Sequence, residues 1–233
     1  MAALAVACVV VGALPAAAQA APDLTGVWWA TTVPDRLAPE GGAAIPFTPE
    51  GKAAYDKRKA DLKSGAFVDR SVHICLPRGL PRAWLTAYPI QILQTPDQVT
   101  ALFEENRQVH IVRMIDKHFD ADFWDPSYMG EAIAHWDSDT LVVDATNFND
   151  DTMLDATGLP HGEKLRVTER LRLLNKGQRL EVTATIEDPQ MYAKPWTARF
   201  SYERRDGVQV ATDWVCGEPH RDVSAVRRVS AGK

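Results

Sequence analysis

A strict alternation of apolar and polar residues between positions 164 and 173 constrains the fold of this chain most strongly. Its apolar row consists of Leu165, Val167, Leu171 and Leu173, and its polar row of Lys164, Arg166, Thr168, Arg170 and Arg172. Successive side chains of a β-strand point to opposite faces, so this period of two predicts a strand with one buried and one solvated face. Glu169 falls within the apolar row. An unpaired buried carboxylate is costly, and we therefore take Glu169 as the first candidate for a functional group.

Further alternating segments follow one another along the chain with short turns between them. We expect strands at 23–29, 90–94, 98–104, 107–116, 131–136, 140–147, 165–174, 178–188, 196–203 and 208–215. No helical crossover pattern separates these segments, which predicts an antiparallel sheet. Closure removes the exposed edges of such a sheet, so the sequence predicts an all-β fold, an antiparallel up-and-down β-barrel, with a β-sandwich as the alternative. One short N-terminal helix is expected from Thr48, its N-cap, to about Lys63.

Residues 1–20 form a short apolar, Ala-rich segment that ends in Ala18-Gln19-Ala20. Two small residues around a variable one are typical of a signal-peptide cleavage site, and the segment is short for a membrane anchor. We therefore expect residues 1–20 to be a signal peptide and residues 21–233 to form a single β-barrel domain without a membrane span, in a periplasmic or secreted protein. The formal net charge of −5 and the scattered basic residues argue against a nucleic-acid partner.

Two cysteines, Cys75 and Cys216, remain outside the signal segment. An even pair in an exported protein predicts a disulfide. That disulfide would close a loop of roughly 140 residues, which makes it a strong constraint on the unfolded chain. A catalytic thiol is the alternative interpretation, but neither cysteine is part of a Cys/His motif.

Two more charged residues are expected at the interior or at its rim. Arg113 belongs to the more apolar row of segment 107–116. A bidentate Arg113–Glu169 pair would satisfy both buried charges; alternatively, both groups address a ligand in a cavity. Asp188 ends the apolar row of segment 178–188, which places it at the rim.

The histidines supply candidate acids. The tight hairpin expected over 131–147 makes His135 and Asp144 diagonal neighbours, close enough for the carboxylate to orient the imidazole. A half-exposed surface pair is the alternative. His161 and His118 fall on loops, where both catalytic and simply solvated side chains occur. No zinc-binding spacing, phosphate-binding loop or dinucleotide fingerprint is present, and we expect neither a metal ion nor a cofactor.

Three segments together resemble a family of exported bacterial proteins of about this length. Residues 135–150 (HWDSDTLVVDATNFND) resemble the pattern W-E-G-D-T-L-V-V-D-T-x-x-F, residues 161–170 (HGEKLRVTER) resemble H-S-x-x-L-x-V-x-E-R, and residues 188–196 (DPQMYAKPW) resemble D-P-x-x-Y-x-x-P-W. The chain departs from these patterns at Asp137-Ser138, where the family has Glu-Gly, and at Gly162, where it has Ser. Gly26-Val27-Trp28 also resembles the first strand of lipocalin-like barrels. The resemblance implies export and a lipocalin-like barrel, but no reaction.

A barrel of this size can hold one small ligand. The aromatic residues expected to contact that ligand are Trp84, Trp124, Tyr192, Trp196 and Phe200. They predict a small apolar or aromatic guest.

Two functions fit these residues. The first is a cofactor-independent lyase, dehydratase or isomerase, with Glu169 or Asp188 as base, His135 or His161 as acid, and Arg113 steadying a developing anion. The second is a periplasmic binding protein for a hydrophobic small molecule, in which the same polar groups only orient the guest.

Overall fold

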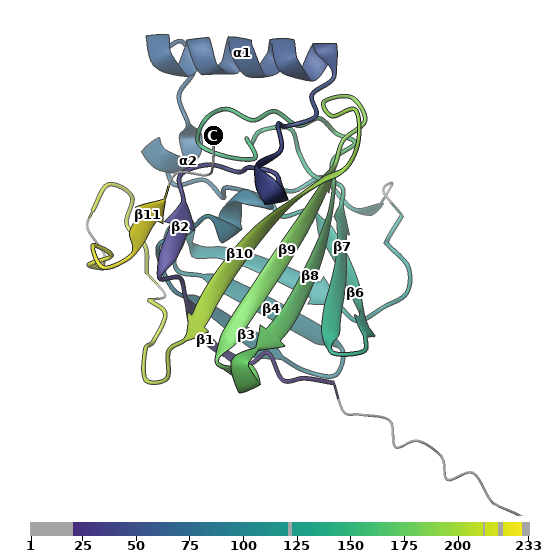
Figure 1. Ribbon diagram of the computed structural model, residues 1–233, viewed down its shortest axis with the longest axis vertical. Coiled ribbons are helices and arrows are strands. Elements are labelled where there is room, and N and C mark those ends of the chain that lie inside the picture. The colour runs from purple at the N-terminus through teal and green to yellow at the C-terminus, as the bar shows by residue number, and fades with distance from the viewer. Residues whose placement is uncertain (1–20, 121–122, 212, 219–220, 230–233) are drawn as a thin grey trace, which may run out of the picture.

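The computed structural model describes residues 21–120, 123–211, 213–218 and 221–229, and the expected signal peptide lies outside them. Among the described residues, nine strands form a closed barrel in the order β1-β10-β9-β8-β7-β6-β5-β4-β3 (Figure 1). The barrel strands are β1 (Gly26–Trp29), β3 (Ile90–Gln94), β4 (Gln98–Phe103), β5 (Gln108–Arg113), β6 (Glu131–Asp137), β7 (Thr140–Thr146), β8 (Arg166–Leu174), β9 (Arg179–Glu187) and β10 (Trp196–Arg204). The predicted all-β barrel with a short helix is confirmed, and the β-sandwich is wrong.

The barrel is not antiparallel throughout, contrary to expectation. β5 and β6 pair in parallel through Val112–Ala132 and Arg113–Ile133, whereas the other neighbouring barrel strands pair antiparallel. An odd number of strands cannot close into a ring with every neighbour reversed, so one pair must be parallel. Parallel neighbours need a long connection, and residues 114–130 provide it.

The last expected strand, 208–215, is also wrong. Gly207 does adopt the left-handed conformation of a turn (φ 82°), but the described residues of 208–215 belong to no strand. The free edge of β10 is taken instead by β1, through Trp28–Arg204 and Trp29–Glu203. β1 closes the ring and places the Trp28 side chain fully in the interior (0% exposed), so a long-range pairing overrides the local turn signal.

The inner and outer rows of β8, β9 and β10 follow the sequence pattern. Their inward side chains are buried, Glu169 among them, and the arginines of β8 face solvent. On β5 the rows are reversed: His110 and Val112 are buried, whereas Val109 and Ile111 are 43% and 39% exposed. The interior row of β5 holds polar residues that find partners inside the barrel, which apolar periodicity cannot reveal.

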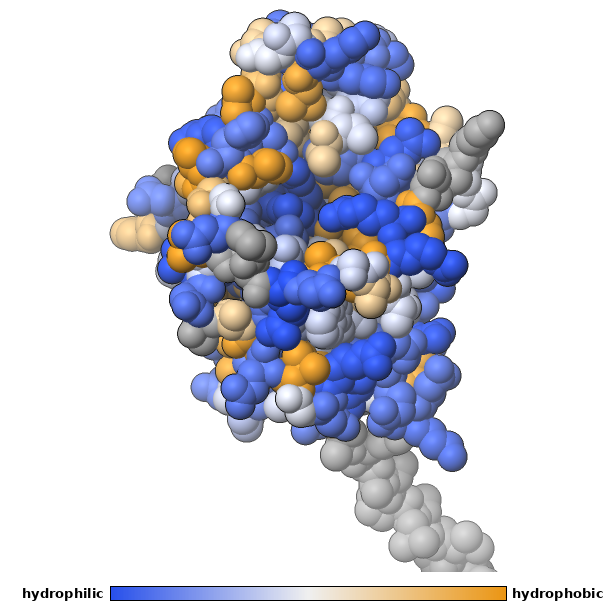
Figure 2. All heavy atoms as spheres, turned by 90° about the vertical axis from the view of Figure 1, so that its left-hand side faces the viewer, coloured by the Kyte–Doolittle hydropathy of each residue, from blue (hydrophilic) through white to orange (hydrophobic). Residues whose placement is uncertain are grey.

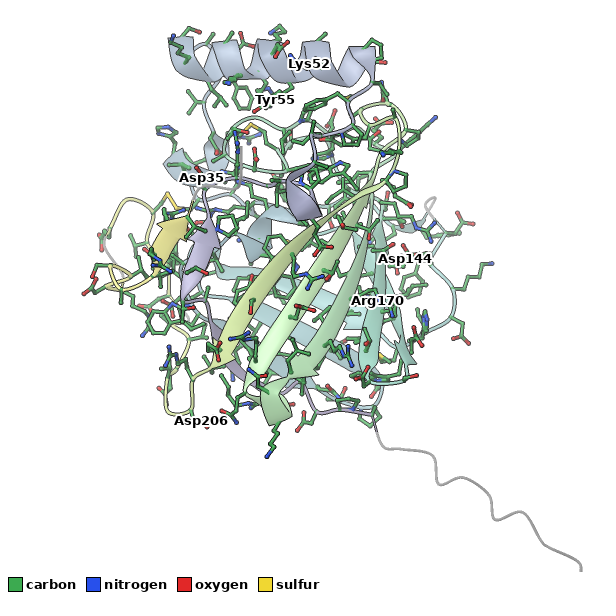
Figure 3. The ribbon with its side chains drawn as sticks, viewed as in Figure 1. Asp35, Lys52, Tyr55, Asp144, Arg170 and Asp206 are labelled. Atoms are coloured by element: carbon green, nitrogen blue, oxygen red, sulfur yellow. A yellow bond between two sulfur atoms is a disulfide. The ribbon has the colours of Figure 1, made fainter. Side chains whose placement is uncertain are left out.

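The chain between β1 and β3 covers one end of the barrel. It contains helix α1 (Pro49–Ser64), the short helix α2 (Arg70–His73) and three-residue 3₁₀ turns at Glu40–Gly42 and Arg82–Trp84. α1 begins as predicted: the Thr48 Oγ1 accepts a hydrogen bond from the Gly51 N–H at 2.9 Å. The helix lies across the barrel end, with Tyr55 on the side that faces the barrel (Figure 3).

Two long-range links fix the remaining chain. A small parallel sheet joins β2 (Thr32–Pro34) to β11 (Arg227–Val229) beside the barrel. A disulfide joins Cys75 to Cys216, as predicted. In the described part of the chain, no helix has both the length and the apolar character that a membrane crossing requires.

Candidate functional site

Glu169 is fully buried, and both of its carboxylate oxygens have partners. It lies on the inner row of β8, opposite Val143 of β7 and Ala184 of β9, and is 0% exposed. The Trp84 indole N–H donates to Glu169 Oε1 at 2.6 Å. His110 Nε2 lies 3.1 Å from Glu169 Oε2. The burial predicted for Glu169 is confirmed, and His110, not Arg113, is the ionisable side chain bonded to it.

Trp84 closes the site from the covered end of the barrel. Its indole is 1% exposed and packs edge-on against Phe103, with ring centroids 5.0 Å apart. The Tyr202 hydroxyl donates to the Trp84 carbonyl oxygen at 2.5 Å. Burial, reinforced by the nearby Glu169 carboxylate, raises the pKa of Tyr202 well above its usual value. The phenol therefore stays protonated and remains a donor.

An ion pair anchors the turn that carries Trp84. Arg82 is 3% exposed, and its Nη2 donates to Asp69 Oδ2 at 2.5 Å. Burial alone would raise the pKa of Asp69, but the Arg82 guanidinium and the Ser71 hydrogen bonds hold it below its usual value. A charged pair behind the turn thus fixes the direction in which Trp84 enters the barrel.

Arg113 does not reach the buried carboxylate. Because the rows of β5 are reversed, Arg113 lies on the outer wall, where its guanidinium stacks over Phe119 at 5.4 Å and Trp124 at 4.9 Å. The expected Arg113–Glu169 pair is therefore wrong. Trp124 is 36% exposed and packs against Arg113 on the outer wall, so it does not belong to the interior site around Glu169.

His135 and Asp144 do not form the expected pair either. His135 is exposed on the outer wall of β6. Asp144 accepts hydrogen bonds from Arg166 Nε and Nη2, each at 2.7 Å, and its Oδ2 lies 3.1 Å from His118 Nε2. The other ring nitrogen of His118 contacts the buried carboxylate of Glu131. Figure 3 shows Asp144 on the barrel wall.

An open groove of about 660 Å³ lies between the outer wall, at Ile133 and Asp144, and residues 116–120 of the connection. Burial alone would lower the pKa of His118, but the hydrogen bonds to Glu131 and Asp144 raise it above its usual value. A protonated His118 held between two carboxylates pins the connection to the outer wall.

The raised pKa of His118 predicts a pH-dependent attachment of this connection. Its contribution to stability is complete below the unfolded pKa, about 6.5, and is lost as the pH rises through the higher folded pKa. We expect proteolysis within 114–130 to accelerate over that rise in pH, and His118→Gln to abolish the dependence. His135→Gln, on the same wall, is the matched control and should behave as the wild type. A cleavage rate that is flat with pH in the wild type would contradict the His118 clamp.

The remaining predicted residues gather near the helix-covered end. Asp188 is 2% exposed and accepts hydrogen bonds from the backbone N–H groups of Gly162 (2.7 Å) and Gln190 (3.0 Å). It therefore braces a turn. His161 Nε2 lies 2.8 Å from Thr152 Oγ1, and burial lowers the pKa of this histidine.

Two of the predicted aromatic contacts lie in the same region. The Tyr192 hydroxyl donates to the Pro160 carbonyl oxygen at 2.7 Å, and burial raises the pKa of Tyr192. Tyr192 packs edge-on against Trp196, with centroids 5.5 Å apart. The structure thus separates the predicted residues into an interior group around Glu169, an outer group around Asp144, and this group at the covered end.

His110 and Tyr202 are among the site residues that the sequence did not single out. His110 shares the inner row of β5 with Gln108, whose Oε1 accepts from the Arg78 backbone N–H at 2.5 Å. Two polar residues in one strand row were the available signal, but they fit a solvated face equally well. The sequence predicts only that Tyr202 is a buried aromatic residue. Its role in the site depends on the position of Trp84, which no pattern in the sequence specifies.

Comparison with known proteins found no family model that matches this chain and no matching sequence among curated proteins. Function therefore has to be argued from the site itself. Among the described residues, no group of three or more histidine, cysteine, aspartate or glutamate side chains is arranged to hold a metal ion. What the interior site offers is a carboxylate and an imidazole in hydrogen-bond contact, enclosed by aromatic side chains.

Proposed function

We propose that the protein is a cofactor-independent acid–base enzyme, a lyase, dehydratase or isomerase, that acts on a small apolar or aromatic molecule inside the barrel. The observation that carries this proposal is the fully buried Glu169 carboxylate in contact with His110. A carboxylate and a histidine that share a hydrogen bond can take a proton from one atom of a substrate and return it to another. Glu169 is the base in this proposal, and His110 replaces His135 and His161 as the acid.

Access to Glu169 requires Trp84 to give way. The Trp84 indole is an apolar ring with one N–H donor, and it occupies the position next to Glu169 that a guest would need. A substrate ring that displaces it would inherit an acceptor on Glu169 and the aromatic contacts of Phe103 and Tyr202. Exclusion of water by the closed aromatic surroundings would strengthen each electrostatic contact to the reacting atoms.

The expected result for Glu169→Gln is loss of proton transfer with the fold and ligand binding retained. Aryl ketones such as acetophenone, incubated with the protein in deuterium oxide, should exchange their α-protons faster than in buffer, as followed by NMR. Removing the base should lower that enzymatic rate by about 10²- to 10⁴-fold. Glu181→Gln is the matched control, because Glu181 faces outward on the adjacent strand β9 and pairs with Arg199. An exchange rate unaffected by Glu169→Gln would remove Glu169 from the mechanism.

A binding protein for a hydrophobic small molecule is the second candidate. It is favoured by the full satisfaction of Glu169 in the closed site, where both oxygens already have partners. In that case the ketones bind without exchange, and Glu169→Gln changes affinity alone. For either function we propose a periplasmic or secreted location, supported by the Cys75–Cys216 disulfide, since such bonds persist in oxidising compartments.

A further inference from the structure

The barrel wall is incomplete along one edge of β10. β9 pairs with β10 from Trp196 to Glu203, whereas β1 pairs with it only at Glu203 and Arg204. After Trp29 the chain leaves the wall to form β2, which pairs with β11 instead of β10. Figure 1 shows β2 and β11 standing beside the barrel next to β10. A gap therefore remains between β10 and this small sheet.

A cavity of about 180 Å³ lies in this gap. Its buried lining residues are Ala30, Val33, Trp84, Phe200 and Tyr202. More exposed residues, including Thr32 and Ser201, line the rest. Figure 2 shows the molecule from the side of β2 and β11, where hydrophilic and apolar residues are mixed at the surface. The cavity thus leads from a mixed surface to a largely apolar lining that includes Trp84, the residue whose indole donates to Glu169.

The charges around the cavity exclude an ionic guest. Arg199 is the charged side chain in its described lining, and it is already bound by Glu40 (2.5 Å) and Glu181 (3.0 Å). The Tyr202 hydroxyl is used on the Trp84 carbonyl, and its raised pKa keeps the phenol neutral. A charged group at the buried end of the cavity, beside Trp84, Phe200 and Tyr202, would lose its hydration shell without gaining a partner.

The size of the cavity suits a single ring. An apolar protein cavity of about 150 Å³ is known to accept benzene. At about 180 Å³, and open to solvent on one side, this cavity has room for such a ring, with a small substituent directed toward the opening. Phe200 and Trp84, two of the aromatic residues predicted to contact a guest, are both in the lining.

We propose that this cavity is a binding site for a neutral molecule with one apolar ring, entered between β10 and β2. Trp84 links the cavity to the interior site: the residue belongs to the cavity lining, and its indole N–H donates to Glu169. The proposal that the cavity binds a ring depends only on its lining residues. The further proposal that a substrate passes through this cavity to reach Glu169 rests on the proposed function.

Toluene is the probe that tests the site. We expect a titration of the folded wild-type protein, followed by methyl NMR, to give saturable shifts at Ala30 and Val33, with nuclear Overhauser contacts from the toluene methyl group to Val33. The exposed methyl groups of Val109 and Ile111 on the outer wall are the internal control for unspecific adsorption. The absence of saturable shifts at Ala30 and Val33, or equal shifts at Val109 and Ile111, would overturn the proposal.

A pair of variants locates the site independently. Thr32→Trp places a large ring at the cavity lining and should weaken toluene binding at least about tenfold, since most of the ring's apolar contact is lost. Thr168→Trp adds the same ring to the outer row of β8, two strands away from β10 and outside the described lining, and should leave the affinity unchanged. Equal affinities for both variants and the wild type would overturn the proposal.

The two proposals fail separately. Toluene binding at Ala30 and Val33 without any proton exchange on ketones would support the cavity and remove the enzyme. Ketone exchange that depends on Glu169, with no saturable toluene binding, would support the enzyme and overturn the cavity as a ligand site.

Discussion

Trp84→Ala is expected to destabilise the protein by about 3–5 kcal/mol, the usual cost of truncating a buried tryptophan. The loss has two parts. The indole is 1% exposed and fills space between Phe103 and Tyr202, and its N–H is the donor to Glu169 Oε1. Of this loss, the buried acceptor on Glu169 that is left without a donor accounts for about 1–3 kcal/mol. Urea unfolding of the variant and the wild type, followed by circular dichroism, measures the difference.

The same variant should be rescued by free indole. Indole has the shape that was removed and carries the N–H that Glu169 Oε1 has lost, so it should raise the midpoint of thermal unfolding. Indene has nearly the same shape without the donor and should bind about tenfold or more weakly, since a hydrogen bond to a charged group contributes about 1.5–3 kcal/mol.

Trp136→Ala is the control for this rescue. Trp136 is a partly buried tryptophan of β6 that packs against the core, and its removal leaves the Trp84 N–H bonded to Glu169. Indole should not stabilise that variant selectively over indene. Equal stabilisation of Trp84→Ala by indole and indene would show that Glu169 does not recognise a donor, which would weaken both functions proposed for the interior.

The parts of the fold that the sequence predicts are those in which apolar periodicity and burial agree. In β8, β9 and the Trp196–Tyr202 part of β10, the inward row is apolar apart from Glu169, so the rows could be assigned and Glu169 placed inside. In β5 the interior row contains Gln108 and His110, which are acceptable there because Arg78 and Glu169 lie next to them. Those partners come from distant segments, and no local pattern reports them.

The sequence predicts one residue at the centre of the candidate site, but it does not predict which side chains surround that residue. A carboxylate in an apolar row identifies Glu169, but the presence of His110 beside it, and not the expected Arg113, depends on which face of β5 turns inward. The role of Trp84 was less accessible still. The sequence predicts that Trp84 contacts a guest, but not that it packs over Glu169, because it lies in an irregular segment whose path no periodicity specifies.

Removal of the disulfide is the second change with a large expected effect. The bond joins Cys75 to Cys216 across a sequence separation of 141 residues, and this loop contains strands β3 to β10. The loop-entropy model gives about 5 kcal/mol for a loop of this length, as an upper figure. Typical domains have about 5–15 kcal/mol in total, so Cys75→Ser combined with Cys216→Ser should lower the urea midpoint of the whole barrel substantially.

Two roles of the disulfide can be distinguished by which part of the protein loses stability when the bond is removed. If it restricts the unfolded chain, the double variant unfolds at lower urea concentration in a single transition, seen equally by circular dichroism and by tryptophan fluorescence. If it only holds the C-terminal arm, that arm frays and the barrel keeps its midpoint. The arm has other attachments, because Arg221 donates to both oxygens of Glu104 at 2.8 and 2.9 Å and β11 pairs with β2. Proteolysis confined to residues after Arg204, with an unchanged midpoint for the barrel, would therefore contradict a global role and assign the bond to the arm alone.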